Sequence, residues 1–235
     1  MYLAFNAPHD PRQAPKRFLE MYPLEKISLT PNYYPQHPFW KEIGNEPGVR
    51  DEALAPYPRS EYAVKKHIQE YYAVITHLDE QVGKIISHLE NQDMLKNTYI
   101  IFTSDHGNNF KTRNREYKRS CHESSIRVPT SLIGNVFQQG GRIKELTNIL
   151  DIHATILDLA KVKNTSHCDG KSVLPLVNKT TKKWENEIFI QISESQLARS
   201  LRTEKWKYCI ADQDSNGSDK ASSNQYTETN LYDLD

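Results

Sequence analysis

A carboxylate and an imidazole stand next to each other in the sequence TSDHG at residues 103–107, as Asp105 and His106. They follow a continuous β-branched and aromatic run, residues 98–104, which predicts a strand. Ligands of open α/β sheets bind at the carboxyl ends of the strands, and a carboxylate beside an imidazole suits a divalent cation there. A strand end capped by a polar turn, with Asp105 accepting backbone hydrogen bonds, explains the same residues. The pentapeptide alone favours neither explanation.

A second imidazole, His9, occupies an equivalent place after the short apolar run at residues 2–5. Pro8 and Pro11 flank it, and because proline restricts the backbone, they stiffen the loop that presents the ring. Taken by itself, His9 also fits an ordinary loop histidine.

A cationic cluster follows the Asp105–His106 pair. Within residues 111–119 there are five lysines and arginines: Lys111, Arg113, Arg115, Lys118 and Arg119. A solvated basic loop is the simplest explanation of such a run. The segment that carries the cluster also begins at the expected ligand-binding edge of the sheet, however. Arg and Lys side chains there could bind an oxyanion. Strand-end carboxylate, imidazole and cationic loop together predict a site for a cation and a tetrahedral anion.

The elements that must position these groups follow α/β logic. Ser60 is placed as the N-cap of an amphipathic helix that ends near residue 91. The strand at 98–104 lacks polar alternation, which predicts burial on both faces, and residues 2–5 are expected to form another buried strand. A further strand is expected at 128–133 and a helix at 149–160. Residues 11–58 are rich in proline and aromatics and predict a long irregular segment.

The pattern changes near residue 184. Short strand candidates separated by polar segments predict a small antiparallel subdomain, and they lie at residues 188–192, 198–203, 206–210 and 231–232. We therefore expect two domains, an α/β domain over 1–182 and a small α+β subdomain over 183–235.

Composition excludes several classes of protein. Lys plus Arg equals Asp plus Glu at 30 each, so no global charge predicts binding to nucleic acid or to an anionic membrane. No apolar run approaches the roughly 20 residues that span a bilayer. The three cysteines form no metal-finger spacing, and a bridge between Cys168 and Cys209 stays open. No feature of the sequence identifies a protein partner. Asn-x-Ser/Thr triplets, which can accept glycans in secreted proteins, begin at residues 164, 178 and 216.

Seven stretches in succession resemble blocks of the type I sulfatases, members of the alkaline-phosphatase-like superfamily. They are APHDP at 7–11, FTSDHG at 102–107, YK at 117–118, ESSIRVP at 123–129, DIHATILDLA at 151–160, DGKSVLPL at 169–176 and LRTEKWKY at 201–208. The resemblance implies an alkaline-phosphatase-like α/β sandwich, with a mixed, mostly parallel sheet between helices, followed by the small antiparallel subdomain.

The resemblance also implies roles for individual residues. Asp105 and His106 would complete a Ca²⁺ site, with Mg²⁺ as the lesser option. Lys118 would bind a sulfate oxygen, and His9 would help protonate the leaving alcohol. We expect His122, Arg113 and Arg115 to line a substrate subsite for a sulfated sugar, because they lie close to Lys118 in the sequence.

The family's paired aspartates and its Cys/Ser-x-Pro-Ser-Arg block, whose Cys or Ser becomes the formylglycine nucleophile, have no counterpart in this chain. The stretch NLYDLD at 230–235 resembles the start of a later block. We therefore expect the C-terminal part of a sulfatase, inactive by itself, from a protein that is exported to a periplasm, the cell exterior or a lysosome. The rival interpretations are a phosphodiesterase or phosphonate monoester hydrolase of the same superfamily, a non-catalytic sulfoglycan-binding relic, and a fragment without a role.

Overall fold

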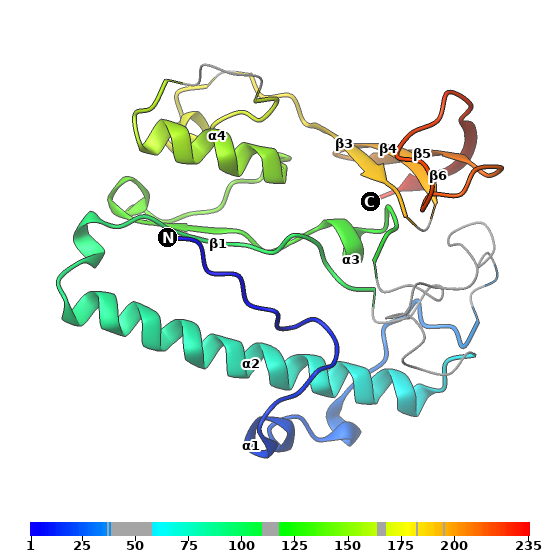
Figure 1. The fold of residues 1–235 in the computed structure, drawn as a ribbon, viewed down its shortest axis with the longest axis horizontal. Coiled ribbons are helices and arrows are strands. Elements are labelled where there is room, and N and C mark those ends of the chain that lie inside the picture. The colour runs from blue at the N-terminus through cyan, green and yellow to red at the C-terminus, as the bar shows by residue number, and fades with distance from the viewer. Residues whose placement is uncertain (37, 39–57, 110–117, 164–167, 182, 195) are drawn as a thin grey trace. The chain divides into compact units, whose positions relative to one another are not determined.

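The structure is a computed structural model that describes residues 1–36, 38, 58–109, 118–163, 168–181, 183–194 and 196–235. The helices and strands of these residues are, in chain order, α1 (Lys16–Glu20), η1 (Leu24–Lys26), α2 (Glu61–Asn91), η3 (Leu95–Asn97), β1 (Ile100–Phe102), α3 (Glu123–Ile126), β2 (Ser131–Ile133), η4 (Asn135–Phe137), α4 (Ile149–Leu159), α5 (Leu174–Val177), β3 (Glu187–Ile192), β4 (Leu197–Thr203), β5 (Trp206–Asp212) and β6 (Thr227–Asp233) (Figure 1). They divide into two compact units, one of Met1–Ile100 with His106–Pro129 and one of Ile101–Asp105 with Thr130–Asp235. The domain boundary expected near residue 183 stays a prediction.

The first unit is organised by the 31-residue helix α2. Its start is confirmed at Ser60, whose side-chain oxygen accepts a hydrogen bond from the backbone N–H of Ala63 at 3.2 Å. Its end at Asn91 is confirmed as well. One face of α2 buries Val64 and Ile68 against Ile27, and this cluster forms the core of the unit.

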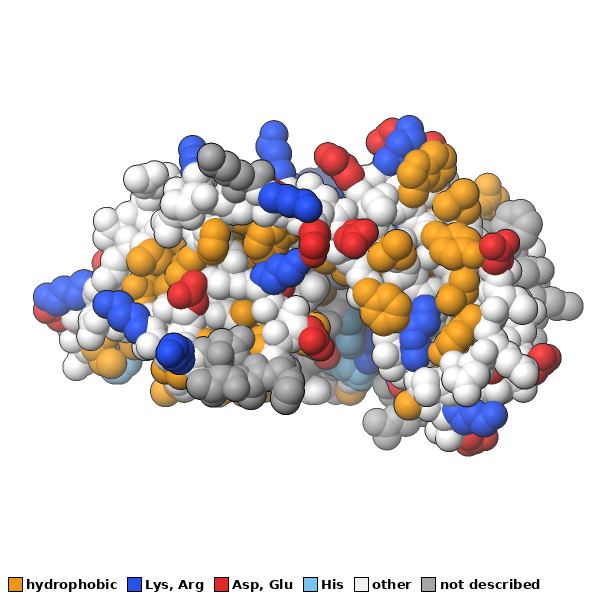
Figure 2. All heavy atoms as spheres, turned by 90° about the horizontal axis from the view of Figure 1, so that it is seen from above, with side chains coloured by type: hydrophobic (Ala, Val, Ile, Leu, Met, Phe, Trp, Pro, Cys, Tyr) orange, Lys and Arg blue, Asp and Glu red, His pale blue; other side chains and the backbone are white. Residues whose placement is uncertain are grey.

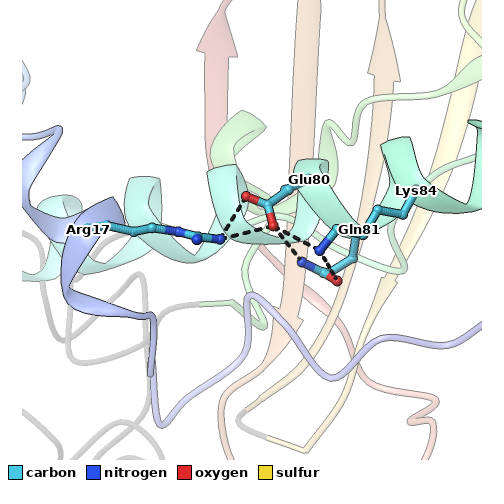
Figure 3. Close-up of polar contacts among 4 residues, drawn as sticks. All are labelled: Arg17, Glu80, Gln81 and Lys84. Carbon is cyan, nitrogen blue, oxygen red and sulfur yellow. Dashed lines mark hydrogen bonds and ion pairs between the residues drawn. The ribbon is translucent and has the colours of Figure 1, made fainter.

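The short helix α1 packs beside α2 (Figure 1), within the segment that the sequence predicts to be irregular. Phe18 of α1 stacks on His77 with ring centroids 5.0 Å apart. At the surface, Arg17 binds both carboxylate oxygens of Glu80 at 3.0 and 2.8 Å, and Lys84 reaches the same carboxylate from one turn along the helix (Figure 3). These contacts hold the chain that follows His9 against a long and regular helix.

One strand prediction is wrong, and another is too long. Residues 2–5 form no strand in the described structure, and the side chains of Tyr2 and Phe5 are exposed. The run at 98–104 contributes only the three residues of β1, which pairs with β2 in a two-stranded sheet and is half-buried or exposed. Both errors have the same cause. An apolar run indicates a preference for burial, but whether it forms a buried strand depends on the elements that pack against it.

The helix α4 links two of the sequence blocks that resemble sulfatases. It begins with a capping box in which Asn148 accepts from the backbone of Leu150 and the buried carboxylate of Asp151 accepts from the backbone N–H of Asn148 at 2.8 Å. The other oxygen of Asp151 accepts from the backbone N–H of Lys171 at 2.8 Å. Just before Lys171, a Cβ on Gly170 would lie 2.1 Å from the carbonyl oxygen of Leu150. One carboxylate therefore both caps α4 and fixes the second block against it.

The predicted antiparallel strands are confirmed as a four-stranded sheet in the order β3-β4-β5-β6. One face is buried, and its buried members are Ile192, Ala198, Ser200, Lys207, Cys209 and Ala211. The opposite face carries an exposed apolar row that crosses all four strands, made of Phe189, Leu201, Tyr208 and Leu231. Figure 2 shows hydrophobic side chains gathered over this sheet. None of the three cysteines, all of which are described, forms a disulfide, so Cys168 and Cys209 are not bridged.

Asp212 at the end of β5 holds the turn that follows, and it predicts an acid-sensitive contribution to stability. Its side chain accepts hydrogen bonds from the hydroxyl of Ser223 and from Ser215, which lower the pKa of this carboxyl to about 2 from 3.8. Because the folded-state pKa is depressed, the stabilisation is present above about pH 4 and is lost as the pH falls towards 2. We expect Asp212→Asn to lower the midpoint of thermal unfolding by the same amount at every pH from 5 to 7. Below about pH 4 the difference between the variant and the wild type should shrink. A difference in unfolding midpoint between Asp212→Asn and wild type that does not change with pH would contradict this expectation. The matched control is Asp214→Asn, at an exposed position.

Candidate active site

His9 and Lys118 are brought together by the fold of the first unit. The Nζ atom of Lys118 lies 3.2 Å from Nε2 of His9, although 109 residues separate them in the sequence. The Nδ1 atom of His9 lies 2.9 Å from the backbone carbonyl oxygen of Asp10. Because a carbonyl only accepts, Nδ1 carries the proton, and Nε2 of the neutral ring accepts from the lysine ammonium. The lone pair of the neutral His9 ring is therefore on Nε2, the atom that faces Lys118.

A tight turn presents the His9 ring. The backbone N–H of His9 donates to the carbonyl of Asn6 at 2.9 Å. The peptide bonds before Pro8 and Pro11 are both cis. The imidazole is exposed, so it is open to a substrate from solvent.

Lys118 is held from its C-terminal side by a polar cluster, which we call the Asn109 cluster. It comprises the buried residues Asn109, Ser120 and His122 together with the exposed Ser124. Asn109 is 1% exposed, donates from Nδ2 to the hydroxyl oxygen of Ser120 at 3.0 Å and accepts from the hydroxyl of Ser124. The hydroxyl oxygen of Ser120 also lies 2.9 Å from Nδ1 of His122. Buried polar groups are stable only when they are paired in this way. The cluster therefore anchors the chain two residues beyond Lys118.

No pattern in the sequence predicts this cluster, apart from the presence of polar residues in an otherwise basic stretch. His122, predicted to line a substrate subsite, is buried at 4% exposure. Its contact with a substrate stays a prediction. Arg113 and Arg115, predicted for the same subsite, lie outside the described residues.

Asp105 and His106 stand where the strand prediction placed them, shortly after β1. Asp105 is exposed. Nδ1 of His106 donates to the backbone carbonyl of Gly107 at 2.8 Å, which leaves the lone pair on Nε2. A ring fixed by a backbone carbonyl in this way is typical of histidines that ligate metals. Among the described residues no group of three or more His, Cys, Asp or Glu side chains could hold a metal ion, and the metal-binding role of this pair stays a prediction.

Gly107 fixes the chain directly after this pair. Its backbone N–H donates to the carbonyl of Ser125 at 2.7 Å, on the short helix α3. A Cβ atom at this position would lie 2.1 Å from the carbonyl oxygen of Ser124. Only glycine permits this close approach of two backbone segments.

Comparison with known proteins identifies the family. The family model described as Sulfatase matches residues 1–162, which include His9, Asp105, His106 and Lys118. The chain belongs to the sulfatase family. A second model, described as N-sulphoglucosamine sulphohydrolase, C-terminal, matches residues 115–217 of this sulfatase chain.

Individual sulfatases and related structures resemble most of the chain. Arylsulfatase K of Homo sapiens is 28% identical over 231 residues, which cover 88% of this chain and 42% of that protein. Choline-sulfatase of Rhizobium meliloti is 30% identical over 221 residues, covering 88% of this chain and 41% of that protein. This sulfatase chain thus spans less than half the length of these curated relatives.

The solved structure of phosphonate monoester hydrolase from Agrobacterium radiobacter superimposes with a TM-score of 0.78 at 18% identity, covering 97% of this chain and 49% of that one. At this identity the likeness concerns the fold. It confirms for this sulfatase chain the expected alkaline-phosphatase-like α/β class with a C-terminal antiparallel sheet. No helix among the described residues has both the length and the apolar character that crossing a membrane requires.

Proposed function

We propose that the full-length protein is a sulfuric ester hydrolase that releases sulfate from a sulfated substrate, with a sulfated carbohydrate as the favoured class. The observation that carries the proposal is the contact of 3.2 Å between Lys118 Nζ and His9 Nε2, two residues of separate blocks within the matched sulfatase region. The match of residues 115–217 to the N-sulphoglucosamine sulphohydrolase model supports a sugar substrate. The choline-sulfatase relative keeps other small sulfate esters within the proposal.

Lys118 and His9 have complementary roles in this proposal. The ammonium of Lys118 offsets negative charge that develops on the sulfuryl oxygens, as preorganised donors do in enzymes. Before the transfer, Nε2 of His9 takes up a proton from solvent. The imidazolium then gives this proton to the bridging oxygen, so that the alcohol leaves neutral and the ring returns to its Nδ1–H form. The Asp10 carbonyl holds the Nδ1 proton in place during this transfer.

The proposal includes a divalent cation and a formylglycine nucleophile. The carboxylate of Asp105 fits Ca²⁺, or less well Mg²⁺, and His106 would add Nε2 as a second ligand. When bound, the cation offsets charge on the sulfate group. The hydrated aldehyde of a formylglycine, which this proposal expects outside the present chain, would supply the attacking oxygen.

Substrate selection is proposed to involve Arg113, Arg115 and His122, on the strength of their position in the sequence beside Lys118. An exported location, in a periplasm, the cell exterior or a lysosome, remains an expectation from the family resemblance. The family resemblance likewise supports the prediction that this chain is inactive by itself.

Matched esters test the proposal against its nearest rival. We expect the full-length protein to hydrolyse 4-nitrophenyl sulfate with a kcat/KM about tenfold or more above that for 4-nitrophenyl phosphate and for the phenylphosphonate monoester. Removal of divalent cations by chelation should abolish turnover, and Ca²⁺ should restore it. A preference for the phosphonate ester would instead identify a phosphonate monoester hydrolase. Binding of sulfated glycans without any turnover would identify a non-catalytic binding protein.

A further inference from the structure

The guanidinium of Arg12 is buried three residues after His9. Its side chain is 2% exposed, and it forms an ion pair with the carboxylate of Asp10, with 2.9 Å between Nη2 and Oδ1. The carboxylate is itself only 7% exposed. Burial of an ion carries a desolvation penalty, which paired charges and hydrogen bonds must offset. Such a group in a surface loop beside a proposed catalytic histidine calls for a physical reason.

Arg12 joins this loop to the helix α2. Its Nη1 donates to Nδ1 of His67 at 2.9 Å, and its guanidinium carbon lies 5.6 Å from the centre of the Tyr71 ring. His67 and Tyr71 are four residues apart and therefore share one face of α2. Because arginine only donates, Nδ1 of His67 must accept, so this ring is neutral and carries its proton on Nε2. Burial raises the pKa of Tyr71, and the charge of Arg12 opposes that rise.

Asp10 connects Arg12 to His9. Its carboxylate pairs with Arg12, while its backbone carbonyl accepts the Nδ1 proton of His9 at 2.9 Å. The carbonyl that selects the tautomer of His9 thus belongs to a residue clamped through Arg12 to a 31-residue helix. The imidazole of His9 is exposed, so little packing of its own restricts its rotation.

We infer that Arg12 is a positioning residue that fixes the tautomer and direction of the His9 ring, so that Nε2 is presented to Lys118 and to the leaving oxygen of the ester. The inference rests on the proposed sulfatase function and extends it to a residue that does not touch the substrate. Proton donation depends steeply on geometry, so a loosened ring should transfer protons poorly while the other groups still act.

The leaving group makes this role measurable. A nitrophenolate leaves without help, whereas an alkyl or sugar alcohol needs a proton on its oxygen. In the full-length protein we expect Arg12→Lys to lower kcat about 10–100-fold for an alkyl sulfate and less than about threefold for 4-nitrophenyl sulfate. A plot of log kcat/KM against the pKa of the leaving alcohol should therefore steepen, as it should for His9→Gln. A parallel shift of the whole line would show that Arg12 acts on stability alone and would overturn the inference.

Three further variants complete the test. Arg17→Gln removes an exposed arginine of the same segment that binds Glu80, and it should retain the wild-type slope. Should Arg12→Lys fail to fold, His67→Leu removes the acceptor on α2 and should steepen the plot. His67→Gln restores a carbonyl oxygen that can accept from Arg12 and should recover the wild-type slope. Equal slopes for His67→Leu and wild type would count against the inference.

A measurement that needs no turnover separates this inference from the proposed function. Protein labelled with ¹⁵N-histidine reports the tautomer of each ring by NMR, and His9→Gln identifies the His9 signals. We expect the Nδ1–H tautomer for His9 in the wild type and a mixture of tautomers in Arg12→Lys. A wild type without any sulfate ester hydrolysis would refute the proposed function. An unchanged His9 tautomer in Arg12→Lys would refute the positioning role, whatever the activity.

Discussion

In the full-length protein, Lys118→Ala lowers kcat/KM for an aryl sulfate by about 10²–10³-fold, the expected effect of removing one charged donor from a transition state. The reason is the position of its ammonium, 3.2 Å from Nε2 of His9 and therefore beside the path of the proton. Steady-state kinetics with 4-nitrophenyl sulfate measure the loss. Because an aryl leaving group needs little protonation, this substrate isolates the electrostatic role of Lys118 from the role of His9.

Lys16→Ala is the matched control for this prediction. Lys16 lies on α1 with its side chain 87% exposed, where it pairs with Glu20. Lys16→Ala removes a positive charge from the same unit as Lys118→Ala does, and we expect its kinetics to equal those of the wild type. The double variant of Lys118→Ala with His9→Gln should lose less than the product of the two single losses, since groups in contact are coupled. Wild-type kinetics in Lys118→Ala would remove this residue from the site.

Gly107→Ala destabilises the protein by about 3 kcal/mol. The added Cβ would meet the carbonyl oxygen of Ser124 at 2.1 Å and its carbonyl carbon at 3.0 Å. Both are backbone atoms of α3, which cannot rotate away as a side chain could. The hydrogen bond from Gly107 N–H to Ser125 would be lost as the segments separate. Urea unfolding measures the change in the free energy of unfolding.

Gly83→Ala gives the opposite sign in the same experiment. Gly83 lies within α2, and a Cβ there meets nothing within 4 Å. Replacing an unhindered helical glycine by alanine stabilises by about 0.5–1 kcal/mol, chiefly because the unfolded chain loses freedom. Equal effects of the two substitutions would show that Gly107 and α3 are not in close contact.

The comparison with sulfatases changes how the sequence blocks are understood. The blocks at 151–160 and 169–176 carry no residue that was assigned to chemistry, yet Asp151 joins them through Asn148 and Lys171. Their role in this chain is to cap α4 and to fix the following segment upon it. Resemblance in these blocks therefore identifies the fold, whereas His9 and Lys118 carry the proposed chemistry.

Local signals in the sequence were sufficient for the longer elements. Ser60 and the apolar period after it predict α2 to within a residue, because capping and amphipathicity are encoded within a few neighbouring positions. The strands of the C-terminal sheet were located for the same reason, although β6 extends beyond the predicted 231–232 to Thr227–Asp233. The strands expected at 2–5 and 98–104 were wrong or too long, because their burial depends on partners that no local pattern specifies.

By itself the sequence determined the family, the principal helices, the antiparallel sheet and the residue types available for chemistry. Only the tertiary structure decided which of these residues meet. The contact between His9 and Lys118 closes a separation of 109 residues, and no local pattern encodes such a pairing. The same holds for Arg12, an arginine that composition would place on the surface. Its charge is stable in the interior because Asp10 and His67, far apart in the chain, converge on it to offset the loss of water.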